Sequence, residues 1–131
     1  MAAAESYPDD LRYHPEHDWA RVDGDEATLG ITWFAQDSLG ELVHYEAPEA
    51  GATVTKDESY GEVESVKAVS DIVAPLSGEV LEVNQKVVAE PETVNDDPYG
   101  DGWLIRIRMA NAGELDALMD AEAYSAHVSE Q

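Results

Sequence analysis

The stretch from Gly61 to Asp71, G-E-V-E-S-V-K-A-V-S-D, constrains the fold of this 131-residue chain more than any other. Polarity alternates in residues 62–64 and again from Asp71 onward, which predicts two strands that approach a common turn. Lys67 lies at the centre of that turn. No Gly, Asn, Asp or Pro occurs within two residues of it to supply the usual turn chemistry. We therefore expect a tight hairpin that presents Lys67 at its tip.

Short β-like runs, separated by turn residues, make up most of the remaining chain. They fall at about residues 19–22, 27–31, 41–46, 54, 60–64, 69–74, 78–84 and 103–109. Many short strands in a small domain predict a mainly β fold, with two sheets packed as a sandwich or flattened barrel. A chain of this length builds one hydrophobic core, so we expect a single domain over residues 11–131, preceded by a flexible acidic lead of residues 1–10.

Two helical segments and one loop interrupt the β pattern. Thr32 is a suitable N-cap for a short internal helix that ends at Leu39, because Gly40 stops it. Residues 91–102 contain too many breakers for more than one helical turn, which predicts a surface loop. Residues 112–128 carry apolar side chains at near-helical spacing, which predicts a C-terminal helical tail.

The chain is strongly acidic, with 29 acidic residues, seven basic residues and a formal net charge of −22. DNA, RNA and anionic membrane surfaces should repel it, so we expect protein partners with basic patches. Salt lowers the Debye length from about 8 Å at 0.15 M to about 3 Å at 1 M, which makes such self-repulsion tolerable in brine and predicts a halophilic source.

The composition also bears on location and redox chemistry. The chain contains no cysteine, which excludes thiolate sites and disulfides and fits a reducing compartment. It has neither an apolar run of membrane-spanning length nor the basic start of a signal peptide. We therefore expect a cytoplasmic protein.

Lys67 is one of only three lysines in the chain, with Lys56 and Lys86. A Schiff-base nucleophile must be an uncharged amine. The neighbouring carboxylates of Glu64 and Asp71 would instead favour the ammonium form. Two interpretations stay open at this point: an ordinary surface lysine, or a lysine acylated to an uncharged amide.

The segment from Gly61 to Ala74 resembles the lipoyl-attachment motif of the glycine cleavage system H-protein family. Further matching segments follow in order over about residues 9–124: H-D-W at 17–19, A-T-L-G-I-T at 27–32, A-Q-D-S-L-G at 35–40, S-G-E-V-L-E-V-N at 77–84, V-N-D-D-P-Y-G-D-G-W-L-I-R at 94–106 and E-L-D-A-L-M-D-A-E-A-Y at 114–124. The resemblance implies a lipoyl/biotinyl-carrier-like fold and a non-catalytic carrier. Lys67 would hold lipoate as a covalent lipoyl-lysine.

The resemblance also implies the partners. A pyridoxal-phosphate glycine decarboxylase would load an aminomethyl group, a folate-dependent aminomethyltransferase would remove it, and a flavin-containing dihydrolipoyl dehydrogenase would reoxidise the arm. Lipoate-attaching enzymes would modify the lysine. Tethering keeps the intermediate at high effective concentration near each enzyme.

Two other kinds of carrier are alternatives. Lipoyl domains of 2-oxo-acid dehydrogenases and biotinyl carriers normally surround the lysine with D-K-A or M-K-M, whereas this chain has V-K-A. An H-like protein that relays lipoyl groups to 2-oxo-acid dehydrogenase subunits would need the same lysine on the same surface, so the sequence does not separate it from a glycine cleavage carrier.

The family shields its loaded arm with carboxylates, and the matching positions here are Asp18 and Asp71. Glu64 and Ser65 are the motif residues beside Lys67. Asp18 stands where family members usually have Glu, which shortens its reach by one methylene, and Ser38 stands where the internal helix often carries His. A solvated strand carboxylate is the alternative role for Asp18.

No metal site is expected. His14 and His17 have H-x-x-H spacing, but Pro15 prevents a continuous helix and no third ligand is evident. The acidic run over residues 95–101 lacks the EF-hand pattern.

Overall fold

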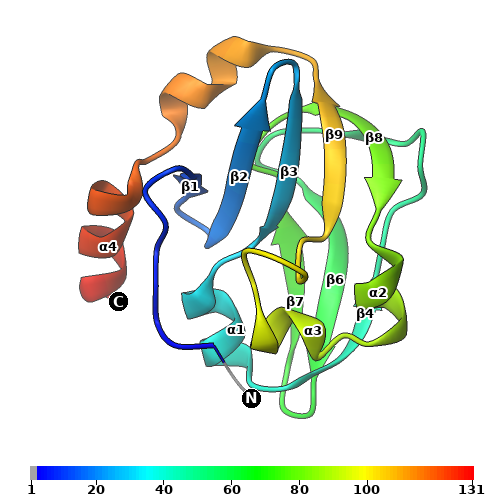
Figure 1. The fold of residues 1–131 in the computed structure, drawn as a ribbon, viewed down its shortest axis with the longest axis vertical. Coiled ribbons are helices and arrows are strands. Elements are labelled where there is room, and N and C mark those ends of the chain that lie inside the picture. Colours follow the sequence, from blue (N-terminus) through cyan, green and yellow to red (C-terminus); the bar gives the residue numbers. More distant parts are fainter. Residues whose placement is uncertain (1–2) are drawn as a thin grey trace.

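The computed structural model describes residues 3–131 and shows two antiparallel sheets packed face to face (Figure 1). The larger sheet has the order β1-β2-β3-β9-β8-β5 and the smaller one β4-β6-β7. The six strands of the larger sheet are β1 (Arg12–His14), β2 (Asp18–Asp23), β3 (Glu26–Ile31), β9 (Ile105–Met109), β8 (Gly78–Val83) and β5 (Thr53–Val54). The smaller sheet contains β4 (Leu42–Glu46), β6 (Ser59–Ser65) and β7 (Val69–Val73). The predicted mainly β sandwich is confirmed.

The hairpin of β2 and β3 shows how the sequence sets the register. Gly24 has φ 65° in the turn, a conformation that most other residues avoid. Trp19 pairs with Gly30, where an added Cβ would lie 2.6 Å from the indole ring, so the small residue admits the large one. The indole N–H donates to the carbonyls of Ile31 and Pro98, which satisfies its only polar atom.

Two hydrophobic clusters fill the molecule. The main core lies between the sheets and includes Leu29, Val63, Ile72, Val80 and Ile107, all almost completely buried. A second cluster lies at the β1 end of the larger sheet and consists of Leu11, Tyr13, Trp19, Tyr99, Ala121 and Tyr124. The second cluster is where the C-terminal helix attaches.

The predicted internal helix is confirmed as α1 (Trp33–Leu39). The Thr32 hydroxyl accepts from the N–H of Ala35, and Gly40 ends the helix at φ 84°. The predicted C-terminal tail has two parts, the 3-10 helix η1 (Ala112–Ala117) and α4 (Ala121–Ser129). They are separated by a bridge between Tyr13 and Met119.

Two short elements, β1 and α2 (Gln85–Ala89), were not predicted, and a third, α3 (Thr93–Asp96), falls in the predicted loop. The single helical turn allowed for residues 91–102 exists as α3. However, the description of that segment as a surface loop is wrong in part, because Thr93, Val94 and Asn95 are buried. The Asn95 side chain explains this: its Oδ1 accepts from the N–H of Leu42, and its amide donates to the Gly40 carbonyl.

The N-terminal lead has no regular secondary structure over residues 3–10, and residues 1 and 2 lie outside the described part. Its backbone is nevertheless held at several points. The Trp33 indole donates to the Ala3 carbonyl, the Tyr99 hydroxyl to that of Ser6, and the Tyr13 hydroxyl to that of Pro8. These bonds fix the lead against α1 and the second cluster, while the mobility assigned to it stays a prediction.

Candidate functional site

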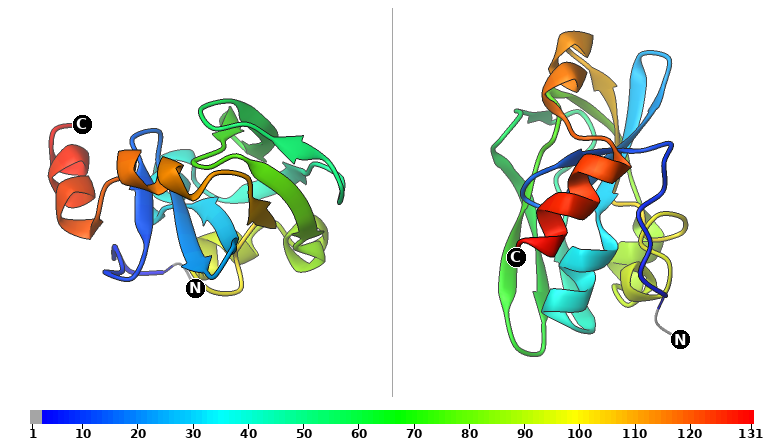
Figure 2. Two further views of the ribbon diagram at one scale, coloured as in Figure 1. Left: turned by 90° about the horizontal axis from the view of Figure 1, so that it is seen from above. Right: turned by 90° about the vertical axis from the view of Figure 1, so that its left-hand side faces the viewer.

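Lys67 lies at the tip of the β6–β7 hairpin, which projects from one end of the molecule (Figures 1 and 2). The backbone N–H of Ser65 donates to the Ala68 carbonyl at 2.8 Å and closes the turn. The Ser65 hydroxyl oxygen, which is buried, accepts from the N–H groups of Lys67 (3.2 Å) and Ala68 (3.1 Å). A serine side chain thus replaces the missing Gly or Asn, as in ST turns. The predicted tight hairpin is confirmed.

The Lys67 side chain is exposed and is flanked by exposed apolar residues. Val66 is 82% exposed and Val69 is 60% exposed. A methyl group built on Gly40, just after α1, would lie 3.9 Å from Cε of Lys67, so the lysine lies alongside the end of that helix. The tip therefore combines a free amine with an apolar rim.

Carboxylates occur on two surfaces of the hairpin end of the molecule, the outer face of the smaller sheet and a hollow beside Gly40. Glu46, Glu62 and Asp71 are cross-strand partners, so they form one row across the outer face of the smaller sheet. Beside Gly40, a hollow of about 490 Å³ is lined by Gln36, Asp37, Glu41, Glu92, Asn95 and Asp96. The surface presented around Lys67 is thus acidic, which favours a partner surface rich in Lys or Arg.

Asp18, the first residue of β2, is almost completely buried, with 2% of its surface exposed. Burial raises the pKa of its carboxyl well above the usual range. The neighbouring Glu16 raises that pKa further, and a backbone hydrogen bond from Val73 lowers it in part. The alternative of a solvated strand carboxylate is therefore wrong. Asp18 instead lies buried at the start of β2, where its backbone pairs with His14 and Ile31.

Asp71 lies on the same strand that Asp18 contacts, two residues before Val73. Because β7 is the outer strand of its sheet, the side away from β6 is free of strand partners. Three residues lie between Val69 and Val73, so the two Cα atoms are about 13 Å apart along the strand. Asp71 is exposed, whereas Asp18 is buried.

Two tyrosines that were not singled out from the sequence, Tyr60 and Tyr124, are buried in the structure. Tyr60 is the bulged residue of β6, and Tyr124 of α4 shares its hydroxyl with Thr32 Oγ1 (2.7 Å) and His17 Nδ1 (2.8 Å). Burial is the largest cause that raises the pKa of each phenol, and Asp18 contributes in both. Their proximity to Asp18 depends on packing between elements far apart in the chain.

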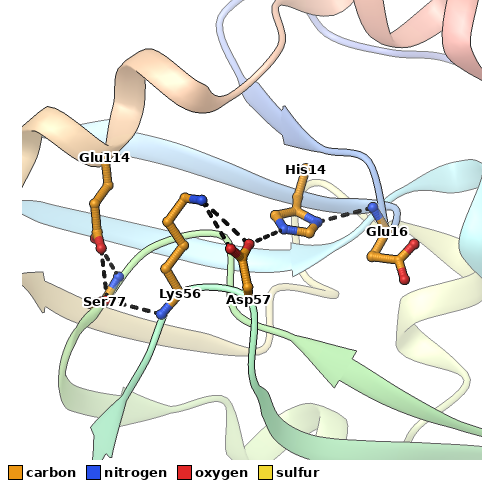
Figure 3. Close-up of polar contacts among 6 residues, drawn as sticks. All are labelled: His14, Glu16, Lys56, Asp57, Ser77 and Glu114. Atoms are coloured by element: carbon orange, nitrogen blue, oxygen red, sulfur yellow. Dashed lines mark hydrogen bonds and ion pairs between the residues drawn. The ribbon is translucent and has the colours of Figure 1, made fainter.

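The two histidines of the H-x-x-H pattern face different partners. The N–H of Glu16 donates to His14 Nδ1, so in the neutral ring Nε2 carries the proton and donates to Asp57 Oδ1 at 2.7 Å (Figure 3). His17 turns instead toward Tyr124. Within residues 3–131, no three His, Asp or Glu side chains are placed to hold a metal ion.

A polar network continues from His14 across the turns that join the sheets. Lys56 Nζ contacts Asp57 at 3.2 Å, and the Lys56 N–H donates to Ser77 Oγ. Both the N–H and the hydroxyl of Ser77 donate to the carboxylate of Glu114 in η1 (Figure 3). This network ties β1, the turn before β6 and the C-terminal segment together at a distance from Lys67, and it explains why Lys56 is not free.

The comparisons with known proteins agree with this geometry. The model of the glycine cleavage H-protein family matches residues 11–131. The chain belongs to the glycine cleavage H-protein family. It is 51% identical to the glycine cleavage system H protein of Symbiobacterium thermophilum over 94% of this chain and 96% of that one. It is 54% identical to that of Marinobacter nauticus, over 93% and 95% of the two chains.

A solved structure supports the same assignment. The crystal structure of a glycine cleavage system H protein from Mycobacterium marinum superposes with a TM-score of 0.86 at 41% identity, over 93% of this chain and 98% of that one. H proteins carry lipoate covalently on a lysine, so this chain is the lipoyl carrier of the glycine cleavage system. The lipoyl-relay alternative is not favoured, since these relatives are named as glycine cleavage components. No helix within residues 3–131 is long and apolar enough to cross a membrane.

Proposed function

We propose that Lys67 is the residue that carries the lipoyl group. The observation that carries this proposal is an exposed amine at the tip of a hairpin whose turn is fixed by Ser65. Lys56 and Lys86 are instead bound to Asp57 (3.2 Å) and Asp101 (3.3 Å). Lys67 is the one lysine of residues 3–131 without such an ion pair. Its amine therefore fits amide formation with lipoate.

Substitution and intact mass test this assignment. Lys67→Arg should abolish the mass increase produced by a lipoate-attaching enzyme, while Lys56→Arg and Lys86→Arg should keep it. Modification that persists in Lys67→Arg would refute the site.

The shuttle role follows from the projection of the hairpin. Bound lipoate would supply a disulfide that takes up the aminomethyl group and two electrons. The chain's own contribution is to present the arm on an acidic surface, which favours docking of enzymes with basic patches. The proposed enzymes are the pyridoxal-phosphate glycine decarboxylase, the aminomethyltransferase and the dihydrolipoyl dehydrogenase. The chain itself is non-catalytic in this proposal and delivers cargo by tethering it.

Asp18 and Asp71 would shield the cargo between these enzymes. A protonated amine beside Asp18 forms a charge-assisted pair in surroundings that exclude water. An adjacent cation also lowers the pKa of a buried carboxyl, so arrival of the amine would ionise Asp18. Asp71, exposed along the same strand, would attract the amine on its way.

A further inference from the structure

A chain of buried hydrogen bonds joins the C-terminal helix to the start of α1. The Tyr124 hydroxyl in α4 contacts His17 Nδ1 at 2.8 Å and Thr32 Oγ1 at 2.7 Å. Thr32 is the N-cap of α1, and its hydroxyl accepts from the N–H of Ala35 at 3.3 Å. Thr32 and Tyr124 are both 0% exposed, so bulk water does not reach either hydroxyl. The chain thus spans the β1–β2 turn, α4 and α1.

The charge of His17 decides whether every hydrogen in this chain has an acceptor. Within residues 3–131, the two hydroxyl groups make the three contacts just described. When Nδ1 is an acceptor, three hydrogens fill them: the Ala35 amide donates to Thr32, the Thr32 hydroxyl to Tyr124, and the Tyr124 hydroxyl to Nδ1. Protonation of Nδ1 brings a fourth hydrogen to the same three contacts. One hydroxyl hydrogen is then buried without an acceptor, which destabilises the arrangement.

The surroundings of the His17 ring also act on its charge. The titratable side chains that face it come from its own turn and from α4, and they are His14, Glu16, Tyr124 and His127. The two other histidines disfavour a charged ring, and the His127 ring centroid is 5.7 Å away. Glu16 and a hydrogen bond with Gln131 favour the charge, while α1 presents the uncharged Phe34. Burial has the largest effect, so the pKa of His17 lies below its ordinary value of 6.5.

Helix α4 depends on its contacts with the rest of the chain because it is short. It has nine residues, whereas an isolated helix in water needs about 12–15. Its attachment includes the stacking of Tyr124 on Tyr13, with ring centroids 4.6 Å apart, and the hydrogen-bond chain. Loss of that chain would loosen α4 and remove support from the cap of α1. Helix α1 ends at Gly40, alongside the Lys67 side chain, so the change reaches the helix beside the proposed lipoyl site.

We propose that His17, Tyr124 and Thr32 form a pH-sensitive latch, which holds α4 on α1 while His17 is neutral and releases α4 when His17 is protonated. The inference does not depend on the proposed carrier function. Because the closed latch disfavours a charged ring, the released form binds the proton more tightly. The latch is therefore closed above pH 6.5, the ordinary pKa of histidine, and opens as the pH falls below it.

Two measurements on the full chain test the latch. Nitrogen-15 NMR of the His17 ring reports which nitrogen carries the proton when the ring is neutral, and the hydrogen count requires Nε2–H with Nδ1 as the acceptor. Hydrogen exchange then follows the backbone amides of Ala35 and Tyr124 from about pH 8 to about pH 5. Protection factors remove the intrinsic pH dependence of exchange. Both factors should fall together, by about tenfold, over this range.

A matched pair of hydroxyl deletions separates the latch from general packing. Tyr124→Phe keeps the ring but removes the hydroxyl, so protonation of His17 no longer adds a surplus hydrogen. Protection of the Ala35 amide should then be lower at neutral pH and should depend much less on pH. Tyr7→Phe is the control, because Tyr7 also packs against Tyr124 but its hydroxyl donates to the exposed Glu5. Tyr7→Phe should keep the pH response of the unsubstituted protein.

Three results would overturn the inference. One is a neutral His17 ring with its proton on Nδ1, which the unsubstituted protein alone can show. Another is protection of the Ala35 and Tyr124 amides that stays constant while His17 becomes protonated. The third is a pH response in Tyr124→Phe as large as that of the unsubstituted protein. None of these results bears on lipoylation of Lys67, which intact mass tests separately.

Discussion

Ser65→Ala tests whether one side chain fixes the hairpin tip. The Ser65 hydroxyl accepts from two backbone N–H groups at 3.2 and 3.1 Å and donates to the Ala68 carbonyl at 3.4 Å, and the substitution removes all three bonds. A neutral hydrogen bond contributes about 1 kcal/mol. The neighbouring residues are exposed, so water can replace some of the lost hydrogen bonds. We therefore expect a loss of about 1–2 kcal/mol in the free energy of unfolding. The m-value should not change, so the urea midpoint should fall by about 0.5–1 M.

Hydrogen exchange locates the effect. The amide protons of Lys67 and Ala68 should exchange faster in Ser65→Ala, and lipoylation of Lys67 should slow because the amine is less well positioned. Ser70→Ala is the control, since the Ser70 hydroxyl donates only to the exposed Asp71 carbonyl. Its effect should stay within about 0.5 kcal/mol. Unchanged stability and unchanged exchange at the tip of Ser65→Ala would refute the role given to this serine.

Three further predictions concern charge. Burial raises the pKa of Asp18, so the free energy of unfolding of the unsubstituted protein should fall as the pH rises above 3.8, the value for the unfolded chain. In urea melts, Asp18→Asn should therefore become more stable relative to the unsubstituted protein as the pH rises. A stability difference between the two proteins that is the same at every pH would contradict this. Burial, and to a smaller extent His127, lowers the pKa of His17, so the free energy of unfolding should fall as the pH drops below 6.5. His17→Asn should make the melting temperature depend less on pH in this range. Asn is a suitable replacement because it tolerates the φ of 76° at this position. The halophilic origin stays a prediction: the melting temperature should rise in molar KCl, and equal values in low and high salt would count against it.

The features that the sequence predicted are those set by neighbouring residues. The turn at Gly24, the Thr32 cap and the Gly40 stop each depend on local backbone preference, and each is found in the structure. The Lys67 hairpin belongs to the same class, because alternation on both sides indicates the strands. Ser65, whose side chain holds the turn, lies only two residues before Lys67, but its hydrogen bonds could be assigned only from the coordinates.

The features that could not be predicted from the sequence depend on contacts between distant segments of the chain. β1 has three residues, and its pairing with β2 and Met119 gives no local signal. The burial of Asp18 depends on the approach of β7 from the other sheet. The bulge at Tyr60 shifts the register by one residue, which periodicity alone does not show. The loop over residues 91–102 is partly buried because Asn95 binds two backbone groups near α1.

In the proposed function, an arm on Lys67 carries the methylene carbon of glycine. The most direct measurement incubates the lipoylated protein with a glycine decarboxylase and glycine labelled with carbon-13 at its methylene carbon, then maps the label by peptide mass spectrometry. We expect an aminomethyl group that carries the label on the peptide containing Lys67, and no label in Lys67→Arg. A lipoylated protein that takes up no carbon from glycine, or label on a peptide containing Lys56 or Lys86, would contradict the account.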